Sequence, residues 1–172
     1  LGFWPGGDRD GNPFVTADMT REVADELRTT LMKCYYNDLK TLNKKISFRG
    51  VHEKLQQLRS QVYVAMFDKD ETLDYVSIMD ALEAIREQLI GDYYSLYLKE
   101  LDQFIDKVRL FRTHFACLDI RQDHRVHRKV VEAILRRAGV IEESVDELDD
   151  AELIRWLTEQ QPEADPEAFE DP

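Results

Sequence analysis

In the first half of the chain, apolar residues recur at every third or fourth position. The run comprises Val23, Leu27, Leu31, Tyr35, Leu39 and Leu42. Because this spacing places the side chains on one face of a helix, it predicts a long amphipathic helix over about 17–44. Thr16 can cap this helix, and Asp18 lies in its first turn, where a carboxylate interacts favourably with the helix dipole.

The same spacing continues through the middle of the chain. It predicts a helix over about 51–67 and another that begins at Ser77 and stops at Gly91, since glycine is typical of helix C-termini. From Asp92 to His114 the pattern is helical again, either as one helix or with a break near Leu98–Asp102. The predicted fold is therefore mainly α.

After His114 the pattern changes. The segment at about 115–121 is short, largely apolar and polar at its end, which is typical of a strand. A lone strand leaves its backbone groups unpaired, so we expect either that it pairs with strands outside this chain or that it is not a strand here. A helix capped by Asp123 and ended by Gly139 follows, and its expected core face comprises Val130, Val131, Ile134, Leu135 and Ala138.

The chain is expected to divide into three parts. Residues 1–16 form a loop, and residues 17–159 form a helical domain that ends in a short helix over about 149–159. Residues 160–172 contain three prolines and five acidic residues, so this tail is expected to be extended or disordered.

The loop Trp4–Pro13 holds three of the seven glycines and two of the five prolines. Neither a helix nor a strand interior favours this composition. The loop lacks the central glycine and closing glutamate of a calcium-binding loop, and the Lys-Ser/Thr ending of a phosphate-binding loop. What remains is a rigid turn that holds Arg9 beside Asp8 and Asp10, either to position a functional group or only to brace the turn.

Four residues near the predicted strand are of types that bind zinc: His114, Cys117, His124 and His127. Their spacing matches no common zinc finger. We therefore expect solvated or hydrogen-bonded side chains in place of a metal site.

Arg121 lies where the predicted strand ends. If the strand belongs to a barrel, polar chemistry collects at its C-terminal end. A guanidinium group is always charged and binds a carboxylate or phosphate through two parallel hydrogen bonds. Arg121 is therefore a candidate anion-binding residue, and the alternative is a surface arginine paired with Asp119 or Asp123.

The formal net charge of −12 argues against a nucleic-acid partner, because phosphate binding requires a basic face. No apolar run is long enough to span a bilayer, and no signal peptide is visible. Cys34 and Cys117 form no motif, so we expect reduced thiols and a cytoplasmic protein without membrane contact.

Two stretches of the sequence resemble motifs of phosphoenolpyruvate carboxylase. Trp4–Thr16 reads WPGGDRDGNPFVT and resembles the family signature WMGGDRDGNPxVT, with Pro5 where the family often has Met. Leu118–Gln122 reads LDIRQ and is similar to the family's strand end (L/V)DIRQES, although Asp and His follow where the family has Glu and Ser. Because members of this family are several times longer, we expect the chain to be an internal segment of such an enzyme.

The resemblance implies an enzyme that carboxylates phosphoenolpyruvate with bicarbonate to give oxaloacetate and phosphate, using Mg²⁺ or Mn²⁺. This is an anaplerotic, carbon-fixing reaction. The implied fold is a helix-elaborated α/β barrel of the TIM type, in a cytoplasmic homotetramer. By the same resemblance, Arg121 matches the arginine that binds the substrate phosphate, and Trp4 matches a tryptophan in the bicarbonate region. Arg9 and Asp10 match residues that shape the site.

The family's catalytic histidine motif, its glycine- and arginine-rich loop and its metal-binding carboxylates are not found in this sequence. Catalysis requires such groups close to the substrate, so we expect no catalytic or metal-binding residue in this segment and no activity from it alone. The alternative is a non-enzymatic, acidic helical module that binds partner proteins. The loop with Trp4 and Arg9 favours the enzyme segment, because a helical scaffold has little use for it.

Overall fold

The computed structural model of the protein describes residues 2–10, 12, 14–67 and 73–159. The predicted mainly α fold is confirmed. In chain order, the elements are β1 (Gly2–Phe3), α1 (Ala17–Lys45), α2 (Val51–Ala65), α3 (Tyr75–Asp92), α4 (Leu98–Phe111), β2 (Cys117–Leu118), α5 (His124–Arg137), the 3₁₀-helix η1 (Val145–Glu147) and α6 (Asp150–Glu159).

The described residues fall into two compact units. The first comprises the residues up to Gly7 together with 14–120, and the second comprises those from Asp8 to Asn12 together with 121–159. The predicted acidic tail, 160–172, lies outside the described residues. The three-part division expected from the sequence stays a prediction.

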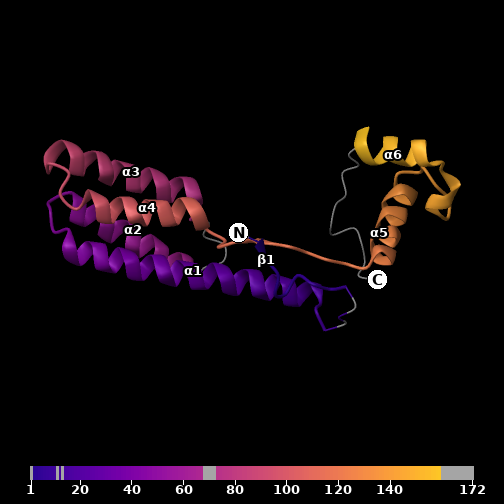
Figure 1. Ribbon diagram of the computed structural model, residues 1–172, viewed down its shortest axis with the longest axis horizontal. Helices are drawn as coiled ribbons and strands as arrows, with labels where there is room; N and C mark the ends of the chain where they lie inside the picture. The colour runs from indigo at the N-terminus through magenta and orange to yellow at the C-terminus, as the bar shows by residue number, and fades with distance from the viewer. Residues whose placement is uncertain (1, 11, 13, 68–72, 160–172) are drawn as a thin grey trace. The chain divides into compact units, whose positions relative to one another are not determined.

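The first unit is built on a bundle of four helices (Figure 1). α1 packs on α2, α2 on α3, α3 on α4, and α4 on α1, so each helix covers the apolar face of its neighbours. Their shared core is fully apolar at its centre, where Met32, Leu39, Leu55, Leu82 and Leu101 have no exposed surface. Burying one such side chain contributes about 1.5–3 kcal/mol, which explains why the bundle forms from these sequences.

α1 follows its prediction closely. The side chain of Thr16 accepts a hydrogen bond of 3.2 Å from the backbone N–H of Met19, as an N-cap does. The predicted apolar face is buried from Leu31 to Leu42. α1 therefore provides a fixed support for the loop that precedes it.

α3 begins and ends elsewhere than predicted. Its N-cap is Asp74, whose carboxylate accepts a 2.7 Å hydrogen bond from the backbone N–H of Ser77. The predicted cap Ser77 therefore lies inside the first turn. Gly91 does not end the helix, because three later residues turn the chain with φ of 52°, 60° and 61°: Tyr94, Ser95 and Tyr97. The stretch from Asp92 to His114 is therefore not one helix: this turn interrupts it just ahead of the break considered near Leu98–Asp102, and α4 starts at Leu98.

The strand prediction was right in place but wrong about the partner. β2 pairs in parallel with β1, with Gly2 opposite Cys117 and Phe3 opposite Leu118. The partner is therefore inside the chain, directly ahead of the glycine-rich loop. Two residues are too few to show the alternating pattern of a strand, and the sequence pattern could not reveal β1.

The second unit contains α5, η1 and α6. Asp123 caps α5 by accepting a 2.8 Å hydrogen bond from the backbone N–H of Arg125, and Gly139 follows the helix with φ of 71°, as predicted. The expected core face of α5 was largely wrong. Among the described residues of this unit, only Leu135 and Ile141 are buried, and Val130 is 45% exposed, because η1 covers only part of the helix.

None of the described helices has both the length and the apolar content that crossing a bilayer requires.

Candidate functional site

The glycine-rich loop starts with a tight turn formed by Trp4, Pro5, Gly6 and Gly7. The backbone N–H of Gly7 donates to the carbonyl of Trp4 at 3.1 Å, and Gly6 has φ of 83°. Proline second and a positive-φ glycine third are the features of a type II turn. The turn is tied to α1, because the hydroxyl of Thr20 donates to the carbonyl of Gly6 at 2.7 Å.

The glycine at the end of this turn allows two backbones to approach closely. A Cβ atom on Gly7 would lie 2.4 Å from the carbonyl oxygen of Asp119, a separation that no real side chain tolerates. Gly7 is itself buried. The loop therefore lies directly against the strand end that follows β2, and only glycine fits at this contact.

In the second unit, the next residues of the loop meet Arg121. Asp8 and Arg121 form an isolated parallel β-bridge, and the backbone N–H of Arg9 donates to the carbonyl of Arg121 at 2.8 Å. Five positions separate Phe3 from Asp8, but only three separate Leu118 from Arg121. The segment between Phe3 and Asp8 is therefore two residues longer than the segment between Leu118 and Arg121.

The Arg121 side chain lies near a carboxylate that the sequence analysis did not consider as its partner. Oδ2 of Asp8 is 4.0 Å from Arg121 Nη1. Asp123, one of the expected partners, instead binds Arg125 through Nε and Nη2 at 3.0 and 2.5 Å. These hydrogen bonds hold the pKa of Asp123 well below its ordinary value.

The other predicted site residues take different places. Asp10 is exposed and its backbone N–H donates to Asp8 Oδ1 at 3.4 Å, while its charge adds to the larger effect of Asp123 in raising the pKa of Arg125. Arg9 is half-buried. Trp4, in the first unit, is 57% exposed. The structure thus brings Arg9 and Arg121 together through the backbone, and their predicted roles stay untested.

The candidate zinc ligands all lie at exposed positions: His114, Cys117, His124 and His127. Among the residues that the structure describes, no three His, Cys, Asp or Glu side chains are close enough to hold a metal ion. The described residues therefore do not fit the Mg²⁺ or Mn²⁺ that the family resemblance implies.

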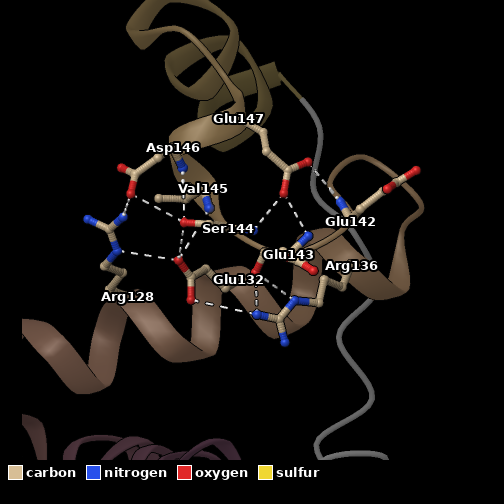
Figure 2. A network of polar contacts seen from close by, with 9 residues as sticks. All are labelled: Arg128, Glu132, Arg136, Glu142, Glu143, Ser144, Val145, Asp146 and Glu147. Atoms are coloured by element: carbon tan, nitrogen blue, oxygen red, sulfur yellow. Dashed lines mark hydrogen bonds and ion pairs between the residues drawn. The ribbon is translucent and has the colours of Figure 1, made fainter.

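A second polar cluster lies between α5 and η1 (Figure 2). At its centre, the carboxylate of Glu132 accepts hydrogen bonds from the backbone N–H of Val145 and the hydroxyl of Ser144, at 3.2 and 3.1 Å. Arg128 donates to Glu132 at 3.3 Å and to Asp146 at 2.5 Å. These contacts, with the Val145 N–H first, lower the pKa of Glu132.

On the other side of the same cluster, Glu147 gathers three backbone N–H groups. It accepts from Glu142, Glu143 and Ser144 at 2.9, 2.6 and 2.7 Å (Figure 2). Arg136 donates to the carbonyl of Glu143. Because the acidic and basic groups of this cluster bind one another and the loop backbone, we interpret it as a clamp that holds η1 to α5.

Sequence reasoning missed two residues of the loop contact, Gly7 and Thr20. It placed Asp8 beside Arg9, either to position a functional group or only to brace the turn. The sequence does contain one signal for this contact, the glycine at position 7. A glycine is required there only if the loop packs directly against the segment LDIRQ. The pairing itself comes only from the fold, because more than a hundred residues separate the two segments.

The family model described as phosphoenolpyruvate carboxylase matches residues 1–72 and 50–167. The chain belongs to the phosphoenolpyruvate carboxylase family. Among curated relatives, the phosphoenolpyruvate carboxylase of Aeromonas hydrophila is 29% identical over 165 residues, and that of Shewanella loihica is 29% identical over 167 residues. The phosphoenolpyruvate carboxylase of Vibrio parahaemolyticus is 28% identical over 166 residues. Each match covers 80% of this chain but 19% of the relative, so the chain spans about a fifth of the length of these carboxylases.

Proposed function

We propose that this chain is part of a phosphoenolpyruvate carboxylase, in which Arg121 and residues of the glycine-rich loop contribute to the active site. The enzyme adds bicarbonate-derived carbon to phosphoenolpyruvate and releases oxaloacetate and phosphate. The observation that carries the proposal is the 2.8 Å hydrogen bond from Arg9 N–H to the Arg121 carbonyl, because it joins the two family motifs in space.

Arg121 is proposed to bind the phosphate group of phosphoenolpyruvate. A guanidinium stays charged at every physiological pH and offers paired N–H donors that match the oxygens of a phosphate. Its side chain is 53% exposed, so a ligand can reach it. The backbone bridge to Asp8 fixes the position from which the side chain extends.

Trp4, Arg9 and Asp10 are proposed to shape the site. Trp4 lies at the start of the tight turn, and its exposed indole suits an apolar wall near bicarbonate, where a reactive intermediate must be kept from water. Arg9 contributes its backbone N–H to the contact with Arg121. Asp10 contributes to the charge around Arg125, at the start of α5.

We propose that the remaining groups come from other parts of the full-length enzyme. These are the catalytic histidine, the carboxylates that bind Mg²⁺ or Mn²⁺ and the glycine- and arginine-rich loop. When bound, the metal polarises oxygens of the substrate and stabilises developing negative charge. We also propose that this enzyme is a cytoplasmic homotetramer with a helix-elaborated barrel, and that the 172-residue chain alone has no carboxylase activity.

The test is phosphoenolpyruvate turnover by the full-length protein with Arg121→Ala. Loss of the phosphate contact is expected to cost about 2–4 kcal/mol of transition-state stabilisation, so turnover should fall by about 30- to 900-fold. The matched control is Arg21→Ala, because Arg21 is an exposed α1 arginine that pairs with Asp18 on the same helix. Near-normal turnover with Arg121→Ala, or an unmodified protein without carboxylase activity, would refute the proposal.

A further inference from the structure

We infer that Thr20 is a positioning residue: its hydroxyl seats the tight turn of residues 4–7 on α1 and thereby places Trp4 at the bicarbonate side of the site. The inference rests on the proposed function, in which the indole of Trp4 forms a wall near bicarbonate. It gives a role in the affinity for the second substrate to a helix residue that lies outside the glycine-rich loop.

Thr20 is buried in a part of α1 that the helical bundle leaves uncovered. It is the only buried residue in the range 17–30, all of which the structure describes, and 8% of its surface is exposed. The buried face that α1 contributes to the bundle starts only at Leu31. A threonine is seldom buried unless its hydroxyl has a partner. We therefore attribute the burial of Thr20 to the loop that contacts it and not to the helical core.

The hydroxyl of Thr20 is directed toward the turn. It donates to the carbonyl of Gly6 at 2.7 Å, a usual length for an O–H···O hydrogen bond. The other carbonyl within reach, that of Thr16 one helical turn earlier, is 3.2 Å away. Threonine inside a helix commonly bonds the carbonyl four residues back, so the shorter contact with Gly6 is a departure from that pattern. It ties α1 to the turn across 14 positions of the chain.

The turn is also fitted to α1 by its shape. A Cβ atom on Gly6 would lie 2.7 Å from Cγ2 of Val23, which is three residues after Thr20 on α1. Gly6 also has φ of 83°, a conformation that strains other residues. The turn is therefore fixed on α1 by two contacts that involve different atoms, a hydrogen bond to its carbonyl and a close approach of its Cα.

The seat of the turn determines where Trp4 lies. Trp4 and Gly7 are the two ends of the turn, and the Gly7 N–H donates to the Trp4 carbonyl at 3.1 Å. Gly7 has a separate support, because it packs against the Asp119 carbonyl. Loss of the hydrogen bond at Gly6 should therefore displace mainly the Trp4 end of the turn. The expected consequence is a weaker affinity for bicarbonate, with the affinity for phosphoenolpyruvate largely kept.

The experiment measures kcat and both KM values in the full-length enzyme for Thr20→Val, Thr20→Ser and Thr41→Val. Thr20→Val removes the hydroxyl and should raise KM for bicarbonate about three- to tenfold, with kcat and KM for phosphoenolpyruvate changed less than about twofold. Thr20→Ser keeps the donor and should recover most of the affinity for bicarbonate. Thr41→Val is the matched control and should change no constant, because the hydroxyl of Thr41, an exposed α1 residue, donates to the Asn37 carbonyl within the helix at 3.0 Å.

Hydrogen exchange of the Gly7 N–H reports on the turn independently of activity. This N–H should exchange faster in Thr20→Val than in the unmodified enzyme or in Thr41→Val. Gly6→Ala disturbs the same seat through the clash with Val23 and should also raise KM for bicarbonate. Because Gly6→Ala leaves α1 unchanged, it tests the inference in the event that Thr20→Val does not fold.

The results distinguish the two proposals. If Arg121→Ala lowers turnover as expected and Thr20→Val selectively raises KM for bicarbonate with faster exchange at Gly7, both stand. If Arg121→Ala lowers turnover but Thr20→Val and Gly6→Ala behave like Thr41→Val, or raise both KM values and lower kcat together, the positioning role is wrong and the proposed function stands. If Arg121→Ala leaves turnover near normal, the proposed function fails, and the role of Thr20 toward bicarbonate fails with it.

Discussion

The hydroxyl of Tyr35, in the middle of α1, donates a hydrogen bond of 2.8 Å to the carbonyl of Arg112, the residue directly after α4. Tyr35 is 1% exposed, and burial raises the pKa of its hydroxyl, so it remains a donor throughout the physiological range. Arg112 has φ of 51° and ψ of −126°, which L-residues rarely adopt. The hydrogen bond therefore stabilises the reversal through which the chain leaves α4 for β2.

The first prediction concerns this hydrogen bond. Tyr35→Phe keeps the ring and its edge contact with Phe104, but leaves the Arg112 carbonyl without its donor. We expect the free energy of unfolding to fall by about 1–2 kcal/mol, as measured by urea denaturation followed by circular dichroism. Tyr94→Phe is the control, because Tyr94 is 93% exposed. Equal stability of the two variants would mean that the contact with Arg112 contributes nothing.

The second prediction compares two glycines. Gly7→Ala places a methyl group 2.4 Å from the Asp119 carbonyl oxygen, so the loop must move away from the strand end. We expect a fall of more than about tenfold in kcat/KM of the full-length enzyme, because the loop sets the position of Arg121. Gly91→Ala, with nothing within 4 Å of its Cβ position, should leave activity unchanged and stabilise α3 by up to about 1 kcal/mol.

A smaller effect of Gly7→Ala than of Gly91→Ala on kcat/KM would contradict this account of the loop. Thermal unfolding of both variants distinguishes a local displacement from a general loss of the fold. We expect the melting temperature of Gly7→Ala to fall by only a few degrees, since the core of the helical bundle does not include the loop.

The helices of the first unit could be predicted because each carries its own signal. The apolar face from Leu31 to Leu42 and the cap at Thr16 are local features, and both lie where the spacing placed them. The boundaries of α3 could not be predicted in this way, because Asp74 and Ser77 are both residue types that favour the N-cap position. The turn after Gly91 is instead made by tyrosine and serine residues in left-handed conformations that their neighbours impose.

The candidate site could likewise be predicted only in part from the sequence. The composition of the loop and the arginine at the end of LDIRQ are visible in the sequence, and they pointed to Arg9 and Arg121. The pairing of Asp8 with Arg121 is an isolated bridge, and β1 is only two residues long. Long-range pairing of such short segments leaves no periodic pattern, so no reading of one sequence could assign the carboxylate to its guanidinium.

The third prediction concerns pH and the clamp between α5 and η1. Hydrogen bonds lower the pKa of Glu132 in the folded state, so its contribution to stability is present above its unfolded pKa. That contribution is lost as the pH falls from about 5 through the lowered folded value. Glu132→Gln should therefore weaken hydrogen-exchange protection of Val145 at pH 7, and the difference from the unmodified chain should disappear once the pH falls below the lowered pKa of Glu132.

Glu159→Gln is the control for this experiment, since Glu159 is an exposed residue at the end of α6 in the same unit. It should leave the protection of Val145 unchanged at both pH values. If Glu132→Gln behaved in the same way, the carboxylate at the centre of Figure 2 would not hold η1 to α5.

The last prediction separates an enzyme segment from an independent helical module. No residue of α6 is buried, and its side chains Ile154 and Leu157 are 60% and 58% exposed. On α5, Val130 is 45% exposed. If the chain belongs to a larger enzyme, these apolar side chains are covered there, and the 172-residue chain should self-associate through them. Size-exclusion chromatography with light scattering measures the association, and Leu157→Glu should reduce it. The control is Ala151→Glu, which adds the same charge to α6 at an exposed small residue and should leave the association unchanged. An unmodified chain that stays monodisperse at high concentration would favour the independent module.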